Sequence, residues 1–280
     1  MLMFKSELKE RLWELAMIGI IFDMDGVLYR GNKPIPGAKE VVEFLKENNV
    51  PFLFLTNNST KTPEMYREKL AKMGIEVSAD RIVTSGLATR LYMERHFTPG
   101  KVFVIGGEGL VKEMDELGWG LVTVEDARKG KWREVKYVVV GLDPGLTYEK
   151  LKYGTLAIRN GARFIGTNPD TTFPGEEGVY PGAGSIIAAL RASTEREPLI
   201  IGKPNEPMYE IVREKLGVEE IWMVGDRLDT DIAFAKKFGM QAIMVLTGVH
   251  TLNDIEKLNI KPDLVLDSVA RLIDYLKVIE

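Results

Sequence analysis

The sequence predicts an α/β fold, and three observations support this. Short apolar segments alternate along the chain with amphipathic segments, as strands and helices do in α/β proteins. The apolar segments lack the in–out alternation of a half-exposed strand, so they fit strands buried on both faces of a parallel sheet. The chain has 280 residues, 45% of them hydrophobic, which is enough for two domains or one large one.

The eight predicted strands are short, rich in β-branched residues and bounded by Gly, Pro or charged residues. They are IGIIF (18–22), PFLFL (51–55), KVFVIG (101–106), KYVVVG (136–141), RFIG (163–166), PLIIG (198–202), IWMVG (221–225) and QAIMVL (241–246). Apolar residues at helical spacing predict helices over 38–45 and 211–216, although Lys215 interrupts the apolar face of the second. A further helix is expected over 62–74. Right-handed crossovers should join the strands.

The first 16 residues stand apart from this pattern. Phe4, Leu8, Leu12 and Leu15 line one face of a predicted helix. We interpret it as an accessory helix that packs on the core or forms a dimer contact. Alternatively, the start is mis-assigned, because Met17 directly precedes the first strand.

The residue types that are missing restrict the chemistry. The chain has no cysteine and two histidines, His96 and His250, which are 154 positions apart. This excludes a cysteine nucleophile, an iron–sulfur cluster, a thiolate zinc site and disulfides, and leaves little room for a multi-histidine metal site. Carboxylates, lysine, hydroxyls and a hard metal ion are the expected tools. The net charge of −4 argues against a non-specific nucleic-acid binder.

No targeting or membrane segment is predicted. Charged residues interrupt the first 17 residues throughout, so they lack a secretory apolar core. No run of 18 apolar residues occurs, so a membrane span is not expected and we predict a cytoplasmic enzyme. A single glutamine, no cysteine and 28% charged residues are a pattern typical of a thermophilic source.

Polar residues follow the first two predicted strands. Segment 18–22 runs into Asp23-Met24-Asp25-Gly26, and sites in open α/β sheets lie at the carboxyl ends of strands. An ordinary Asp/Gly turn is the alternative. Segment 51–55 runs into the TNNST segment (56–60), whose hydroxyls, amides and backbone N–H groups suit an anion. Helix capping explains Thr62-Pro63 but not the TNN run before it.

Two later strands also end in charged residues. Segment 198–202 is followed by Lys203-Pro204, where Pro imposes extended or turn geometry on the lysine; most isolated lysines are surface groups. Segment 221–225 is followed by Asp226-Arg227-Leu228-Asp229-Thr230-Asp231, in which Asp229 fits a helix cap. Asp226 and Asp231 would converge with Asp23 and Asp25, and like charges in a partly dry site repel. A hard divalent cation with oxygen ligands, most simply Mg²⁺, would relieve that repulsion.

In this order, DMDGVLY, TNNST, an isolated Lys-Pro and GDRLDTD resemble the four motifs of the haloacid dehalogenase (HAD) superfamily. The segments GTNPD (166–170), PGAGS (181–185) and LTGV (246–249) resemble its class IIA branch, the NagD-like or p-nitrophenyl phosphatase type. The resemblance covers residues 17–280 and implies a Rossmann-like, doubly wound core with a large α/β cap inserted between the second and third motifs. Thr56 and Lys203 are 147 positions apart, whereas a simple crossover needs only about 30 residues. We predict a core at 17–80 and 183–280 and a cap at 81–182.

The resemblance implies Mg²⁺-dependent hydrolysis of small-molecule phosphate monoesters. Asp23 would be the nucleophile that forms an aspartyl phosphate, and Asp25 the acid that protonates the leaving group and then activates water. Lys203 would bind substrate and offset negative charge. The other implied roles are phosphate binding by Thr56, Asn57 and Asn58, Mg²⁺ binding by Asp23, the Asp25 backbone carbonyl, Asp226 and Asp231 (the last directly or by orienting the others), and cap contacts to substrate by Asn168 and Asp170, which alternatively only shape a Pro turn.

Three other functions are compatible with parts of the pattern. A phospho-accepting signalling module would keep a stable phospho-Asp, but Asp25 and the inserted segment argue against it. An inactive metabolite-binding protein fits poorly with the complete set of motif residues. A phosphomutase or phosphotransferase would pass the phosphoryl group to a second substrate. The natural substrate is not specified, since in this branch the cap sets specificity; a homodimer formed through the caps is implied by resemblance alone.

Overall fold

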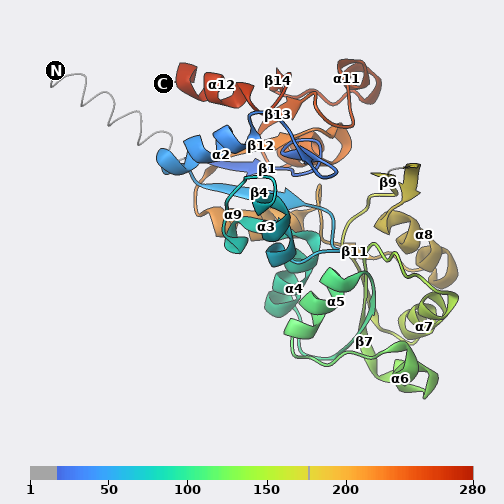
Figure 1. Ribbon diagram of the computed structural model, residues 1–280. Helices are drawn as coiled ribbons and strands as arrows, with labels where there is room; N and C mark the ends of the chain where they lie inside the picture. The colour runs from blue at the N-terminus through green and yellow to red at the C-terminus, as the bar shows by residue number, and fades with distance from the viewer. Residues whose placement is uncertain (1–17, 176, 280) are drawn as a thin grey trace. The chain divides into compact units, whose positions relative to one another are not determined.

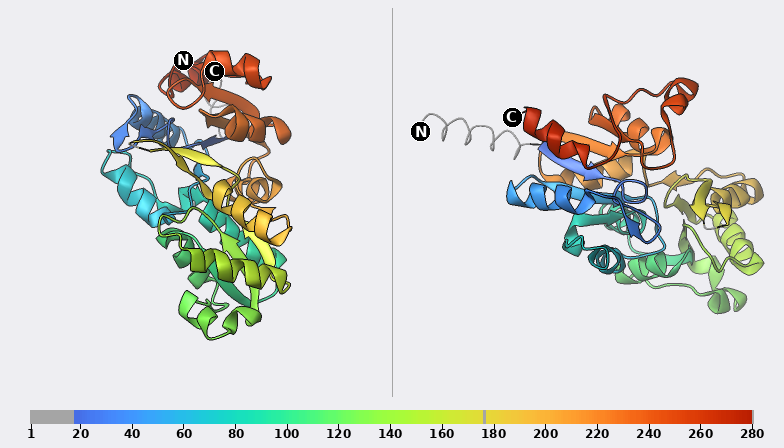
Figure 2. Two further views of the ribbon diagram at one scale, coloured as in Figure 1. Left: turned by 90° about the vertical axis from the view of Figure 1, so that its right-hand side faces the viewer. Right: turned by 45° about the horizontal axis from the view of Figure 1, so that its top comes forward.

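The computed structural model describes residues 18–175 and 177–279 (Figures 1 and 2). The helix predicted in the first 16 residues lies outside this part. The chain divides into two compact units. The first unit contains the described residues up to Thr56 together with 66–83 and 212–279, and the second contains 57–65 and 84–211. In the described residues, no helix combines the length and apolar character needed to cross a membrane.

A six-stranded parallel sheet forms the centre of the first unit (Figure 1). Its strands are β1 (Ile18–Phe22), β4 (Phe52–Thr56), β5 (Ile82–Thr84), β12 (Glu220–Gly225), β13 (Gln241–Val245) and β14 (Leu264–Leu266). They lie in the order β14-β13-β12-β1-β4-β5. Numbered along the chain, this is the order 3-2-1-4-5-6 of a doubly wound Rossmann sheet. The predicted fold class is therefore confirmed.

The strand order fixes where a site can form. The direction of the crossovers reverses between β1 and β12, and ligands of such sheets bind outside the carboxyl ends of the strands at this switch point. The register aligns these ends, because Phe22 lies beside Val224 on one side and Phe54 on the other. Asp23 and Asp226 thus follow the ends of two adjoining strands.

Helices and a small hairpin complete the first unit. One apolar cluster joins Val41 and Leu45 of one helix, Leu272 and Leu276 of another, and Phe22 of the sheet, all fully buried. This packing explains the helical spacing at 38–45. The elements are β2 (Tyr29–Arg30), β3 (Lys33–Pro34), α2 (Ala38–Glu47), η1 (Ala79–Arg81), η3, a π-helical turn (Leu228–Ile232), α10 (Ala233–Lys237), α11 (Leu252–Leu258) and α12 (Arg271–Ile279). Helices α3 (Pro63–Ala71) and α9 (Glu206–Leu216) each contribute to both units.

The second unit contains a four-stranded parallel sheet with the order β11-β8-β7-β6 and a two-stranded antiparallel ribbon. Its strands are β6 (Lys101–Ile105), β7 (Val135–Val140), β8 (Arg163–Gly166), β11 (Leu199–Ile200) and the ribbon strands β9 (Thr172–Gly175) and β10 (Gly178–Pro181). Its helices are α4 (Ser85–His96), α5 (Glu108–Glu116), α6 (Val124–Arg128), η2 (Lys131–Glu134), α7 (Tyr148–Arg159) and α8 (Ala183–Thr194).

The eight predicted strands are all present, with one difference in placement. The segment 198–202 shortens to the two residues of β11 and pairs with β8 in the second sheet, although the predicted core range includes it. Six further strands were not predicted, namely β2, β3, β5, β9, β10 and β14. They have two to four residues each, which is too short for a periodic pattern. The predicted domain limits at 80/81 and 182/183 stay a prediction.

A buried carboxylate links two helices of the second unit. Arg90 of α4 donates to Glu113 of α5 at 2.8 Å and also contacts Glu94 and Glu116 at 3.1 and 3.3 Å. The Glu113 side chain is only 4% exposed. Burial raises the pKa of the Glu113 carboxyl, and Arg90 acts in the opposite direction. The guanidinium therefore stabilises a charge that water cannot reach.

We predict that Arg90→Met lowers the free energy of unfolding at pH 7 by about 3 kcal/mol, since it leaves a buried charge without its partner. Losing the cation raises the pKa of Glu113 further, so the penalty is present above that pKa and fades as the pH falls through it. Urea unfolding at pH 7 and at lower pH measures both effects. Adding Glu113→Gln should recover most of the loss; an equal loss at every pH would contradict this account.

Candidate active site

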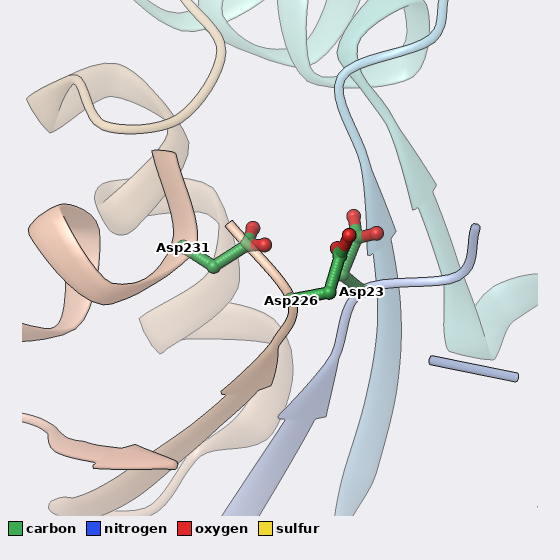
Figure 3. Close-up of side chains that lie close together, drawn as sticks. All are labelled: Asp23, Asp226 and Asp231. Atoms are coloured by element: carbon green, nitrogen blue, oxygen red, sulfur yellow. The ribbon is translucent and has the colours of Figure 1, made fainter. Parts of the chain in front are cut away.

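Three aspartates converge within the first unit (Figure 3). Asp23 follows β1, Asp226 follows β12, and Asp231 lies in the π-helical turn η3. One carboxylate oxygen from each lies within 4.8 Å of the other two. Asp226 and Asp231 are each 1% exposed, and Asp23 is half-buried. We call Asp23, Asp226 and Asp231 the acidic cluster; its convergence was predicted from the strand ends.

Two glycines let neighbouring loops approach the Asp226 carboxylate. A Cβ at Gly248 would lie 1.9 Å from Asp226 Oδ2, and one at Gly26 would lie 2.6 Å from it. Gly26 also has φ +85°, which L side chains rarely adopt. Because Gly248 has no side chain, the next residue comes close enough for its backbone to bond the carboxylate: the Val249 N–H donates to Asp226 Oδ2 at 2.7 Å. The glycine after Asp25 and the LTGV segment therefore shape the cluster.

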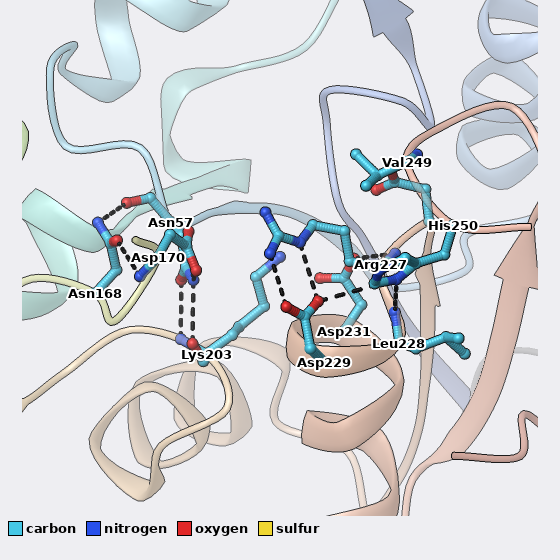
Figure 4. Close-up of polar contacts among 11 residues, drawn as sticks. Asn57, Asn168, Asp170, Lys203, Arg227, Leu228, Asp229, Asp231, Val249 and His250 are labelled. Carbon is cyan, nitrogen blue, oxygen red and sulfur yellow. Dashed lines mark hydrogen bonds and ion pairs between the residues drawn. The ribbon is translucent and has the colours of Figure 1, made fainter. Parts of the chain in front are cut away.

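His250 helps to hold the loop between Asp226 and Asp231 (Figure 4). Its Nδ1 accepts from the Leu228 N–H at 2.8 Å, and its backbone N–H donates to the Asp226 carbonyl at 3.3 Å. In the same loop, the Arg227 N–H donates to Asp231 Oδ2 at 3.1 Å. No role was predicted for His250, because nothing in the local pattern links it to this loop.

The predicted helix cap at Asp229 is wrong. No side-chain capping bond is present at this helical turn. Instead, the Asp229 carboxylate accepts from two nitrogens of Arg227, at 2.8 and 3.1 Å. Burial acts to raise the pKa of Asp229, but Arg227 outweighs it, so the pKa is lowered. Asp229 therefore forms an ion pair with Arg227 and does not cap the helical turn.

Asp25 lies outside the acidic cluster and is exposed. Contact with protein atoms still removes part of its hydration, which raises the pKa of its carboxyl. Nearby Lys69 acts in the opposite direction, as do the backbone N–H groups of Gly31 and Gly26. The ammonium group of Lys69 is held 3.7 Å above the centre of the Tyr29 ring. A partly desolvated carboxyl beside a cation suits proton transfer.

Thr56, at the end of β4, is buried and shares a side-chain hydrogen bond with Tyr66 of α3. Tyr66 is itself buried. Burial, followed by the charges of Asp23 and Asp25, raises the pKa of its phenol, so the phenol stays protonated. Tyr66 was not predicted to belong to the site, since a single tyrosine in a helix gives no local signal.

Within the second unit, four of the other predicted residues are joined by hydrogen bonds (Figure 4). Asn57 contacts Asp170 and the backbone of Lys203, and Asn168 donates to the Asn57 carbonyl at 2.6 Å. Lys203 is only 1% exposed. The structure thus joins Asn57 of the second motif, Lys203 of the third motif and the GTNPD segment by hydrogen bonds.

The end of the TNNST segment is shaped by local hydrogen bonds. Asn58 Oδ1 accepts from the backbone N–H of Thr60 at 2.9 Å and from its hydroxyl at 2.7 Å. The Thr62 hydroxyl accepts from the Met65 N–H at 3.4 Å, which confirms the predicted cap at Thr62-Pro63. The carboxamide oxygen of Asn58 therefore stabilises the turn by accepting both hydrogen bonds from Thr60.

The acidic cluster fits a hard divalent cation. Three neighbouring carboxylates repel one another unless a cation or protons neutralise them. Oxygen ligands about 2.1 Å from Mg²⁺ lie at most about 4 Å apart, and the three oxygens lie within a comparable 4.8 Å. The cluster also lies at the switch point of a doubly wound sheet, where the ligands of this class of α/β protein bind, so it could hold a metal ion there.

Comparisons with known proteins identify the family within this class. A model described as haloacid dehalogenase-like hydrolase matches residues 20–120, and a second HAD-hydrolase-like model matches residues 200–272. An acid sugar phosphatase from Staphylococcus aureus is 43% identical over 86% of this chain and 91% of its own length. The chain belongs to the haloacid dehalogenase superfamily, in the class IIA branch of NagD and the p-nitrophenylphosphatases, and is a phosphoric monoester hydrolase of this type.

Solved structures agree with this assignment. The crystal structure of a hypothetical protein from Pyrococcus horikoshii is 76% identical and superposes with a TM-score of 0.91, over 93% of this chain and all of that one. A 4-nitrophenylphosphatase from Thermotoga maritima is 39% identical with a TM-score of 0.85, over 94% of this chain and 98% of that one. The family predicted from the four motifs is confirmed.

Proposed function

We propose that the protein hydrolyses small-molecule phosphate monoesters through an aspartyl phosphate on Asp23, with Mg²⁺ bound at the acidic cluster. The cluster at the switch point of the sheet is the observation that carries this proposal. Relatives named 4-nitrophenylphosphatase and acid sugar phosphatase support a small phosphate ester as substrate. A cytoplasmic location, a homodimer and a thermophilic source stay predictions.

Two aspartates would divide the chemistry. A carboxylate oxygen of Asp23 attacks phosphorus while the P–O bond to the leaving group breaks, and the Asp25 carboxyl gives its proton to the departing oxygen. Water then attacks the phosphorus of the aspartyl phosphate and gives a proton to Asp25, which releases inorganic phosphate and restores Asp23. The raised pKa of Asp25 supports its role as the acid, because more of it stays protonated near neutral pH.

Asp23, Asp226, the Asp25 backbone carbonyl and Asp231 would hold the metal, the last directly or by orienting its neighbours. Bound Mg²⁺ supplies positive charge that neutralises the carboxylates and the phosphoryl oxygens. Val249 and Arg227 support this role by fixing Asp226 and Asp231 through their backbone N–H groups. Thr56 and the TNNST backbone would bind the phosphate, and Lys203 would offset its charge.

The proposal is tested by assaying p-nitrophenyl phosphate and a panel of about a hundred phosphate esters for steady release of inorganic phosphate with Mg²⁺. Sugar phosphates and other small metabolites are the expected substrates. A phosphotransferase would instead pass the phosphoryl group to a second hydroxyl. A signalling module would accumulate phospho-Asp after acetyl phosphate treatment, with mass spectrometry showing one stable adduct and little phosphate release. Either result would replace the proposal.

Metal removal gives a prediction from the cluster itself. Treatment with EDTA should reduce phosphate release to background, and excess Mg²⁺ should restore it, because the three carboxylates cannot accept a phosphate dianion without a cation. Mg²⁺ should also raise the thermal unfolding midpoint, since it binds only the folded cluster. Asp226→Asn should weaken that shift, whereas Asp115→Asn on the exposed face of α5 should leave it unchanged. Full activity after complete chelation would refute the metal requirement.

A further inference from the structure

The side chain of Asn57 is fully engaged within the second unit. Its Oδ1 accepts from the backbone N–H of Lys203 at 2.9 Å, and its Nδ2 donates to the backbone carbonyl of Lys203 at 3.0 Å. The same Nδ2 donates to the Asp170 carboxylate at 3.2–3.3 Å. A carboxamide has two N–H donors, and both are used. A phosphate contact from this residue would therefore have to come from its backbone.

Other bonds hold Asn57 itself in place. Its carbonyl accepts from Asn168 Nδ2 at 2.6 Å and from the Ser85 hydroxyl. Asn168 Oδ1 in turn accepts from the Asp170 N–H at 3.1 Å. Asn168 and Ser85 are buried, so these bonds compete little with water. We call Asn57, Asn168 and Asp170 the Asn57 clamp (Figure 4).

The approach of the clamp to Lys203 requires a glycine before the lysine. A Cβ at Gly202 would lie 2.6 Å from Asn57 Oδ1 and 2.6 Å from the Thr167 carbonyl oxygen. The Gly202 N–H also donates to that carbonyl at 2.8 Å. The backbone that leads into Lys203 is thus held on both sides, and the lysine side chain starts from a fixed point.

We propose that Asn57 and Asp170 are positioning residues that act on catalysis through the backbone of Lys203, rather than by binding phosphate through their side chains. This rests on the proposed function, in which the Lys203 ammonium offsets charge on the transferring phosphoryl group. The ammonium group of a long, flexible lysine side chain is positioned better for a transition state when the backbone that carries it is held in place. Asn57 holds the Lys203 backbone through its N–H and its carbonyl, and Asp170 holds Asn57.

A double-mutant cycle between Asn57→Ala and Lys203→Ala tests this proposal with p-nitrophenyl phosphate. Asn57→Ala alone should lower kcat by about 10²-fold with little change in KM, which is the scale of a misplaced catalytic group. In the Lys203→Ala background, followed with enzyme in excess, the same change should lower the rate by less than about 2-fold, because a cycle is non-additive when one residue acts through the other. Equal losses in both backgrounds, or no loss in either, would overturn the proposal.

A milder variant tests the proposal in case Asn57→Ala fails to fold, and a control makes the same Asn→Ala change away from the clamp. Asp170→Asn keeps the shape of the clamp, and we expect a kcat loss of several-fold that also disappears without Lys203. Asn160→Ala removes a carboxamide that donates to the Arg133 carbonyl on the surface of the same unit, and it should leave kcat unchanged. If Lys203→Ala alone keeps full activity, the cation role in the proposed function fails. If Lys203→Ala loses activity but Asn57→Ala costs the same in both backgrounds, the clamp proposal alone fails.

Discussion

Replacing Asp23 by Asn should abolish steady turnover while leaving the fold intact. The amide has the shape of the carboxylate but is no nucleophile toward phosphorus, so we expect a loss on the order of 10⁶-fold, the scale seen when a covalent nucleophile is removed. Inorganic phosphate release from p-nitrophenyl phosphate with saturating Mg²⁺ measures the effect. No phosphoprotein should form with any substrate.

The same substitution makes a second, independent prediction about stability. Asn removes one of three neighbouring negative charges in the acidic cluster, so the metal-free variant should unfold at the same temperature as the native protein or above it. The stabilisation by Mg²⁺ should decrease, because one charged ligand is gone. Asp115→Asn makes the same chemical change on the exposed face of α5 and should alter neither activity nor metal response. Near-native turnover by Asp23→Asn would remove this residue from the mechanism.

Replacing Asp25 by Asn should separate the two halves of the reaction. The variant cannot donate a proton, but p-nitrophenolate is stable enough to leave without one, so p-nitrophenyl phosphate should still phosphorylate Asp23. The second half should stall, because no carboxylate takes the proton of the attacking water. We therefore expect a burst of about one equivalent of nitrophenolate, followed by turnover about 10²–10⁴-fold below the native rate.

Leaving-group chemistry and pH sharpen this prediction. An alkyl or sugar phosphate, whose leaving alkoxide needs the proton, should give no burst with Asp25→Asn. In the native enzyme, the raised pKa of Asp25 keeps the acid protonated to higher pH than an ordinary aspartate, and kcat/KM for alkyl phosphates should fall as pH rises through it. The fall should be weaker for p-nitrophenyl phosphate. Rapid-quench kinetics and intact-protein mass spectrometry would detect the phosphoenzyme; identical behaviour of both substrates would exclude acid catalysis by Asp25.

Some features missed from the sequence share one physical cause. His250 and Leu228 are 22 positions apart, and Asn57 and Lys203 are 146 positions apart, yet each pair is joined by a hydrogen bond. No local period or propensity encodes such a bond. Asp229 differs, because its partner Arg227 is only two positions away; the local sequence allows both a cap and this ion pair, and the folded loop forms the ion pair.

The sequence by itself determined the strand–helix alternation, the parallel sheet and the motif residues. Buried strands must be apolar throughout, and chemistry at a switch point must use polar residues directly after those strands, so both appear as local patterns. Tertiary structure alone decided the six short strands, the pairing of β11 with β8 in the second sheet, and the long-range bonds of Asn57 and His250. These depend on which distant segments meet, and the free energy of those contacts is gained only once those segments have come together.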